Sequence, residues 1–161
     1  MFVGDGWYLD ELKKDFAGAP EVHFAGVQGG EILAGLYADA DFLLFPTAIG
    51  SEPVLDKDSM PHWRNAMIGQ SALNIMPVLA SNRVGREDDV NSTMTFYGSS
   101  FMTDETGVLI ESMDREEEGI RVHTYDLDKI MRKRREWGIF RDRRPEMYEE
   151  ILTSDGKEHR E

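Results

Sequence analysis

Residues 62–84 read HWRNAMIGQSALNIMPVLASNRV, and this stretch decides the fold. Its first fifteen residues place Trp63, Met67 and Leu73 among apolar positions that recur at the spacing of a helix face. Gly69 weakens the middle of this predicted helix, since glycine has a low helix propensity. The short apolar run Val78–Val84 follows at once and predicts a strand. A helix that leads directly into a buried strand is typical of layered α/β proteins.

Outward from this stretch, helices and short strands alternate along the chain. We expect helices at residues 10–16, 31–38, 62–76, 127–137 and 145–152. We expect strands at residues 22–27, 41–45, 78–84, 93–97, 100–102, 108–112 and 120–126. Loops are expected at 46–57 and at the acidic segment 85–92, and a polar tail at 153–161. This order predicts an α/β (α+β layered) fold.

Composition excludes several classes of function. The 161 residues carry a net charge of −13, which argues against nonspecific binding of nucleic acid. The absence of cysteine excludes disulfides, thiolate metal sites and a cysteine nucleophile. The four histidines are scattered, so we expect no metal, and the frequent methionines are typical of core filling rather than of a cofactor site. No apolar run reaches the ~20 residues of a membrane helix, and a cytoplasmic protein is the expectation.

From residue 45 onward the sequence resembles a known family. The segments that carry the resemblance, in order, are Phe45–Pro53 (FPTAIGSEP), His62–Arg64 (HWR), Pro77–Gly85 (PVLASNRVG), Thr95–Phe101 (TFYGSSF) and Trp137–Pro145 (WGIFRDRRP). They are similar to the nitrilase superfamily of carbon–nitrogen hydrolases, and among these to the N-carbamoylputrescine amidases. The resemblance implies part of a nitrilase-type α-β-β-α sandwich, with the domain at residues 46–152.

The resemblance also implies a chemistry that this chain lacks. Such amidases use a Cys nucleophile, a Glu base and a Lys that stabilises the oxyanion; the thiolate attacks the carbamoyl carbon, ammonia leaves, and water then releases carbon dioxide and the diamine. It places the Glu and Lys ahead of this chain and the Cys near residues 27–30, where there is none. We therefore expect no catalytic residue and no activity for this chain.

Because the catalytic residues are absent, the resemblance implies that this chain contributes only a wall of the substrate site. The loop from Thr47 through Ser51 to Glu52 follows a predicted strand, where open sheets bind ligands. Glu52 is expected to pair with the distal ammonium of a carbamoylated diamine. The alternative is that Glu52 is a solvated loop carboxylate.

Residues 1–45 show a second resemblance. The segments Phe2–Gly6, Tyr8–Lys14, Val22–Gly26 and Leu36–Asp41 are similar to the nucleotide-sugar-binding half of retaining GT-B glycosyltransferases. The similarity implies a foreign β-α-β segment and a chimera with a junction near Phe45. Trp7 stands where that family usually has proline, and its acidic pair does not follow Pro46.

Two further segments leave alternatives open. Residues 62–64 either shape the mouth of a site or begin a helix with Trp63 in the core, and Asn82 is expected to satisfy backbone groups. Near the C-terminus, Trp137, Ile139 and Phe140 lie among basic residues. This arm predicts a docking element for a homo-oligomer. A non-catalytic assembly module is thus the alternative to an amidase-family chain, and a glycosyltransferase fragment ranks third.

Overall fold

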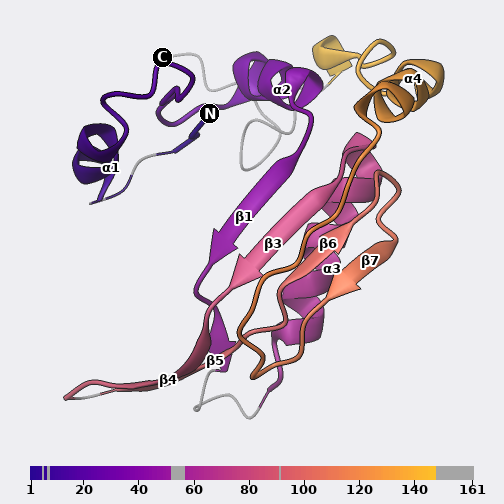
Figure 1. Cartoon of the computed structure of the whole chain (residues 1–161). Helices are drawn as coiled ribbons and strands as arrows, with labels where there is room; N and C mark the ends of the chain where they lie inside the picture. Colours follow the sequence, from indigo (N-terminus) through magenta and orange to yellow (C-terminus); the bar gives the residue numbers. More distant parts are fainter. Residues whose placement is uncertain (5, 7, 52–56, 91, 148–161) are drawn as a thin grey trace. The chain divides into compact units, whose positions relative to one another are not determined.

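A computed structural model describes residues 1–4, 6, 8–51, 57–90 and 92–147 (Figure 1). The chain divides into two compact units. One comprises residues 1–39 together with the segment from Pro145, and the other comprises residues 40–144. The first unit contains the helices α1 (Leu9–Asp15) and α2 (Gly30–Asp39) and the 3₁₀ turn η1 (Pro145–Met147).

The second unit contains both sheets of the described chain. The four-stranded sheet has the order β1 (Leu43–Thr47), β3 (Val78–Asn82), β6 (Phe101–Thr103) and β7 (Leu109–Ser112). The three-stranded sheet has the order β2 (Gly50–Ser51), β5 (Thr93–Tyr97) and β4 (Val84–Asp88). The unit also holds α3 (Met60–Asn74) and α4 (Leu127–Trp137).

Helix α3 is the crossover of a parallel β-α-β unit. It lies between β1 and β3 in the chain, and the two strands pair in parallel from Leu43↔Val78 to Thr47↔Asn82. The strands β6 and β7 then extend the sheet in antiparallel fashion. Figure 1 shows α3 against one face of this sheet and the segment after β7 running back over the opposite face toward α4. The core therefore lies between α3 and one sheet face.

The core forms around Trp63. Its ring lies 5.5 Å from that of Phe101 and 5.8 Å from that of Tyr97, and these three side chains are at most 6% exposed. Val78 and Ala80 complete the buried cluster from β3. Leu43 and Phe45, which alternate along β1, pack against the same cluster. One face of the sheet is thus apolar and closed by α3.

The expectation of a mixed α/β fold is confirmed, and several elements lie close to their expected places. Helix α4 spans residues 127–137, and the Asp126 side chain caps it by accepting a hydrogen bond of 2.9 Å from Lys129 N. Helix α3 begins two residues before its expected start, with Ser59 as N-cap.

Other expectations about strands are wrong. The strand expected at 78–84 is present but ends at Asn82 as β3, and Val84 begins β4, which belongs to the other sheet. The acidic segment expected as a loop forms β4, because its backbone pairs with β5 from Val84↔Tyr97 to Asp88↔Thr93. Side-chain charge does not prevent pairing in an exposed hairpin, whose backbone bonds need no buried side chain.

The expected strands at 22–27 and 120–126 are also wrong. The first is reduced to an isolated parallel bridge between Phe2 and Phe24, so of the two strands expected in the N-terminal β-α-β segment only the second forms, as the start of β1. In the second, Ile120 and Val122 alternate with polar residues but are 85% and 83% exposed, and no strand is assigned there. Alternation fixes which side chains share a face but does not supply a partner strand. The end of the expected helix at 145–152 and the tail 153–161 lie outside the described residues.

Gly50 provides a test of the junction between the two sheets. A Cβ at this position would collide with the backbone oxygen of Thr95 and lie 2.7 Å from Met94 Sδ. We expect Gly50→Ala to lower the free energy of unfolding by about 1–3 kcal/mol, the usual cost of forced overpacking. Gly69→Ala is the control, because a Cβ at this α3 position meets nothing within 4 Å. It should be neutral or stabilise by up to about 1 kcal/mol. Urea denaturation of both variants decides it, and equal stabilities would show that β2 does not approach β5 this closely.

Candidate functional site

The parallel strands β1 and β3 end side by side, and the candidate site is built on this edge. Thr47 is the last residue of β1, and its register partner Asn82 is the last residue of β3. Beyond them the chain passes into the second sheet through Gly50 and Val84. Carboxyl ends of parallel strands are where open α/β sheets present ligand-binding loops.

Asn82 holds this edge together through its side-chain amide. Its Oδ1 accepts hydrogen bonds from Ile49 N (2.8 Å) and from the Thr47 hydroxyl (2.9 Å). Its Nδ2 donates to the backbone oxygens of Ile49 and Gly98, both at 2.9 Å. The expectation that Asn82 satisfies backbone groups is confirmed. The loop after β1 and the turn between β5 and β6 are therefore tied to one side chain.

Thr47 and Ser51 are placed on different sheets. The Thr47 hydroxyl lies 2.9 Å from the backbone oxygen of Ser81 and from Asn82 Oδ1, so its proton is engaged within the fold and its lone pairs remain as acceptors. Ser51 pairs with Thr95 of β5. Glu52, the third residue expected in the substrate wall, lies outside the described residues. A substrate role for these three residues stays a prediction.

The turn after β5 approaches its neighbours closely, as the Tyr97-Gly98 pair indicates. Gly98 adopts a φ of 51°, a left-handed conformation that favours glycine. A Cβ there would lie 2.5 Å from the backbone oxygen of Arg115. Ser100 Oγ accepts a hydrogen bond of 2.9 Å from Asn82 N, which continues the tie between β3 and this turn.

An ion pair that sequence reasoning missed lies just before α3, between Asp58 and Arg115. Asp58 Oδ2 accepts a hydrogen bond of 2.5 Å from Arg115 Nη2, and Asp58 Oδ1 accepts one of 3.2 Å from Met60 N. The Arg115 hydrogen bond, followed by that of Met60, lowers the pKa of Asp58 below its ordinary value. The available signal was Arg115 itself, a lone cation in the acidic run 114–118.

The start of α3 belongs to the core rather than to a site mouth. Trp63 is 6% exposed within the cluster described above, which supports the helix-start alternative for residues 62–64. Arg64 Nη2 donates to the backbone oxygen of Ser99 (3.3 Å), and its guanidinium lies 5.7 Å from the ring of Phe101. Burial raises the pKa of Tyr97, whose ring lies 5.8 Å from that of Trp63.

The described edge can position a backbone loop, but it holds no activated nucleophile. Cysteine is absent from the whole sequence. Ser99 is 2% exposed and its hydroxyl donates to the backbone oxygen of Tyr97, so it is used structurally. Ser71 is fully buried in a hydrogen bond with Thr103. Among the described residues, no three His, Asp or Glu side chains gather as metal ligands would.

Comparison with known proteins shows the family to which this chain belongs. The family model described as "Carbon-nitrogen hydrolase" matches residues 22–135. The chain belongs to the carbon–nitrogen hydrolase family. The match begins well before Phe45, so residues 22–44 fall within it, and nothing in the comparisons supports the glycosyltransferase resemblance or a chimera.

Individual relatives match over a similar part of the chain. An N-carbamoylputrescine amidase of Solanum tuberosum is 48% identical over 122 residues, which cover 73% of this chain and 41% of that protein. A citrullinase of Francisella tularensis is 52% identical over 114 residues, 70% of this chain and 40% of that protein. A carbon–nitrogen hydrolase structure from Helicobacter pylori aligns with a TM-score of 0.61 at 29% identity, covering 75% of this chain and 44% of that one. The carbon–nitrogen hydrolase chain described here thus spans about two fifths of the relatives that it matches.

Replacing the side-chain NH2 of Asn82 by an oxygen tests the role of this residue at the edge. In Asn82→Asp, a carboxylate oxygen would replace the amide that donates to Ile49 and Gly98, and it would face their two carbonyl oxygens. We expect a loss of about 1–3 kcal/mol of unfolding free energy at pH 7, the cost of unsatisfied polar groups. Asn65→Asp, at an exposed position of α3, is the matched control and should change stability by less than about 0.5 kcal/mol. Denaturant titration of the two variants measures the difference, and equal stabilities would contradict the assignment of Asn82 as the tie.

Proposed function

We propose that this chain forms one wall of the active site of a carbon–nitrogen hydrolase that cleaves the terminal carbamoyl group of linear ureido compounds, and that the chain alone is inactive. The observation that carries the proposal is the combination of 48% and 52% identity to two such enzymes with the absence of cysteine. The proposed wall is the segment from Thr47 to Ser51 that follows β1, together with Glu52, which lies outside the described residues.

The substrate class follows from what the two relatives share. N-carbamoylputrescine and citrulline both carry a ureido group on an aliphatic chain and differ at the distal end. A hydrolase of either substrate must stabilise the same tetrahedral centre at the carbamoyl carbon. We propose N-carbamoylputrescine for this chain's complete enzyme, with Glu52 as the partner of the distal ammonium. The products would be putrescine, carbon dioxide and ammonia.

Inactivity follows from the requirement for a nucleophile. Attack on the carbamoyl carbon needs a thiolate or an equally activated group next to a base. The hydroxyl of Ser99 donates to the backbone oxygen of Tyr97 and that of Ser71 to the backbone oxygen of Asp104, so neither donates to a histidine. Loss of a covalent nucleophile removes several orders of magnitude of rate.

Ammonia release provides the test of the inactive state. We expect none from N-carbamoylputrescine, or from citrulline, at any pH from about 6 to 9, a range in which a Cys–Glu site would work. The potato amidase is the positive control under the same conditions. Turnover by this chain that survives repeated purification would show that another nucleophile is in use and would overturn the inactive reading.

A non-catalytic assembly module is the second candidate, and one observation favours it. Trp137, the last residue of α4, is 67% exposed, an unusual placement for so large an apolar side chain. Phe140 is half-buried, with the Arg134 guanidinium 5.2 Å from its ring. Ile139 lies between them and is also half-buried. We propose that this arm docks on a second copy of the chain.

Two double variants separate apolar docking from charge. Burial of Trp137 and Phe140 in an interface would contribute roughly 1.5–3 kcal/mol each, whereas exposed ion pairs contribute about 0–1 kcal/mol. We expect Trp137→Ala with Phe140→Ala to shift any oligomer toward monomer more than Arg143→Ala with Arg144→Ala does. Analytical ultracentrifugation measures both. An equal or reversed effect would mean that the arm does not dock through its apolar side chains.

A further inference from the structure

We propose that the outward face of α4 is a docking surface for anionic phospholipid headgroups at a membrane surface. The face is formed by the side chains of Lys129, Arg132 and Arg135, which together are called the cationic stripe. The helix would lie on the headgroups without crossing the bilayer, since no helix of the described residues is long and apolar enough to cross one. Docking of this kind involves neither substrate nor nucleophile, so it stands or falls separately from the proposed function.

Helical spacing places the cationic stripe on the solvent side of α4. Ile130 and Arg134 are 6% and 8% exposed and mark the side of the helix that packs on the unit. At about 100° per residue, Arg132 lies opposite that buried side, and Lys129 and Arg135 lie about one turn away in either direction. All three cations are exposed. The stripe therefore extends about 9 Å along the helix axis, at a rise of about 1.5 Å per residue.

The inward cations of α4 are engaged, whereas the cationic stripe is not. Lys133 Nζ donates a hydrogen bond of 3.0 Å to Glu105 Oε1, and Arg134 Nη1 donates one of 2.9 Å to the backbone oxygen of Ala40. In the part of the chain that the structure describes, no hydrogen bond or ion pair engages the side chains of the cationic stripe. The inward cations hold the helix in place, and the outward ones remain available to a partner.

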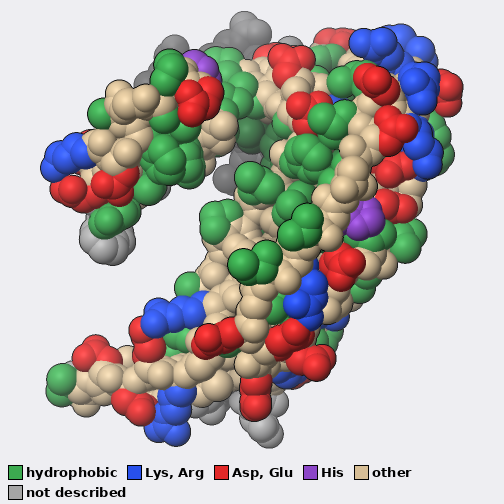
Figure 2. All heavy atoms as spheres, viewed as in Figure 1, with side chains coloured by type: hydrophobic (Ala, Val, Ile, Leu, Met, Phe, Trp, Pro, Cys, Tyr) green, Lys and Arg blue, Asp and Glu red, His purple; other side chains and the backbone are tan. Residues whose placement is uncertain are grey.

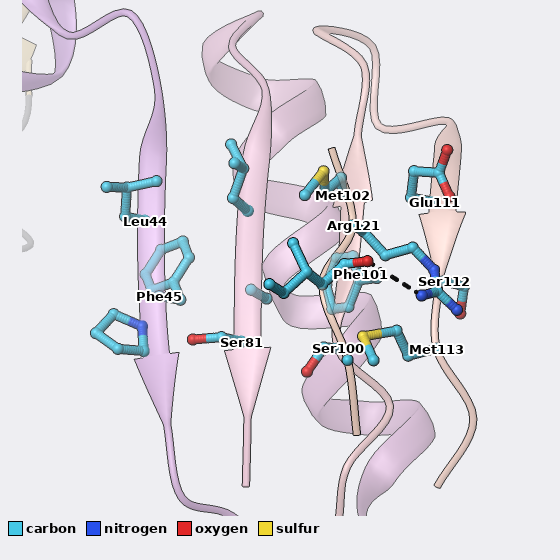
Figure 3. Close-up of a pocket in the computed structure, with 15 residues that line it drawn as sticks. Leu44, Phe45, Ser81, Ser100, Phe101, Met102, Glu111, Ser112, Met113 and Arg121 are labelled. Carbon is cyan, nitrogen blue, oxygen red and sulfur yellow. Dashed lines mark hydrogen bonds between the residues drawn. The ribbon is translucent and has the colours of Figure 1, made fainter. Parts of the chain in front are cut away.

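Several other cations of the unit are compensated by neighbouring carboxylates. Figure 3 shows Arg121, which donates to the backbone oxygen of Ile120 (3.2 Å) and is paired with Glu117. Three further ion pairs in the unit are Arg83–Glu87, Arg86–Asp88 and Arg115–Asp58. The cationic stripe differs from all of these, because no side chain of the described residues compensates its charge.

The positive charge is concentrated at one end of the unit. Residues 128–144 contain eight Lys or Arg and three Asp or Glu, although the whole chain has a net charge of −13. Figure 2 shows Lys and Arg side chains gathered over α4. In Figure 1 the β4–β5 hairpin and the acidic turn after β7 lie at the end of the sheets away from α4. Salt screens charges beyond about 10 Å at 0.1 M, so a flat anionic surface against α4 would be attracted by the stripe more than repelled by those segments.

The composition of the face favours lipid headgroups over an acidic protein or a nucleic acid. Asp128 and Glu136, at the two ends of α4, are the other exposed residues around Arg132, and Trp137 lies about 140° around the helix from it. Protein interfaces depend on apolar and aromatic anchors, and single-stranded nucleic acid binds by stacking on aromatic side chains. The stripe offers neither. An anionic membrane requires no anchor, because each Lys or Arg interacts with the potential of many headgroups at once.

Vesicle cosedimentation of the whole chain tests the proposal. The vesicles contain phosphatidylcholine alone or phosphatidylcholine with phosphatidylserine. The test variant is Arg132→Gln with Arg135→Gln, and the control is Lys57→Gln with Arg86→Gln, which removes the same charge from exposed positions outside α4. We expect the wild-type chain and the control to bind only the phosphatidylserine vesicles. The test variant should bind them about twentyfold more weakly, since each cation near an anionic surface strengthens binding about fivefold.

A conservative variant separates charge from helix structure. Arg132→Lys with Arg135→Lys keeps the charge and should retain the binding of the wild-type chain. Gln and Lys are both good helix formers, and circular dichroism checks that α4 persists in each variant. Loss of binding in the Lys variant, or an equal loss in the test variant and the control, would overturn the proposal. Equal binding of the wild-type chain to both kinds of vesicle, or tighter binding to polyglutamate or to duplex DNA than to phosphatidylserine vesicles, would also overturn it.

Discussion

The packing of Trp63 is the contact on which the rest of the described unit depends. This side chain projects from the first turn of α3 and touches Tyr97, the last residue of β5, and Phe101, the first residue of β6. It thereby joins the helix to both sheets. Without it, the turn that carries Gly98 and receives the amide of Asn82 would lose its position, since Asn82 can bond Gly98 only while β5 and β6 are held against β3. The position of the candidate site therefore depends on the packing of this core.

Sequence patterns predicted the parts of the unit that depend on local periodicity. The helical spacing of Trp63 and Met67 and the short apolar run at Val78 gave α3 and β3 nearly at their observed bounds. The sequence patterns gave wrong predictions where pairing with another segment decides whether residues form a strand or a loop. Residues 85–88 belong to the acidic segment that was expected as a loop, yet they pair with β5, whereas residues 120–126 alternate like a strand but have no strand assigned. Alternation is a property of one segment, whereas a strand forms only when a second segment pairs with it.

The candidate site shows the same division. The role of Asn82 could be inferred from its residue type at a strand end, because an amide there both accepts and donates. Neither the Asp58–Arg115 pair nor the need for glycine at position 50 could be inferred, since each arises from segments that meet only in the fold. Family resemblance supplied what the described geometry does not contain, namely the expectation for Glu52 and the identity of the missing nucleophile.

The account holds that residues 40–144 form a specific scaffold of the carbon–nitrogen hydrolase family, closed by α3 on one sheet face and open on the other. Hydrogen–deuterium exchange of the purified chain, followed by mass spectrometry, measures this most directly. Amides of β3 and of the second half of α3 should exchange slowest, because they surround Met76 and Val78, which are fully buried. Those of the β4–β5 hairpin should exchange much faster, because most of its side chains are exposed. Uniformly fast exchange across residues 40–144 would contradict the account, since it would show that the scaffold does not form around Trp63 in this chain alone.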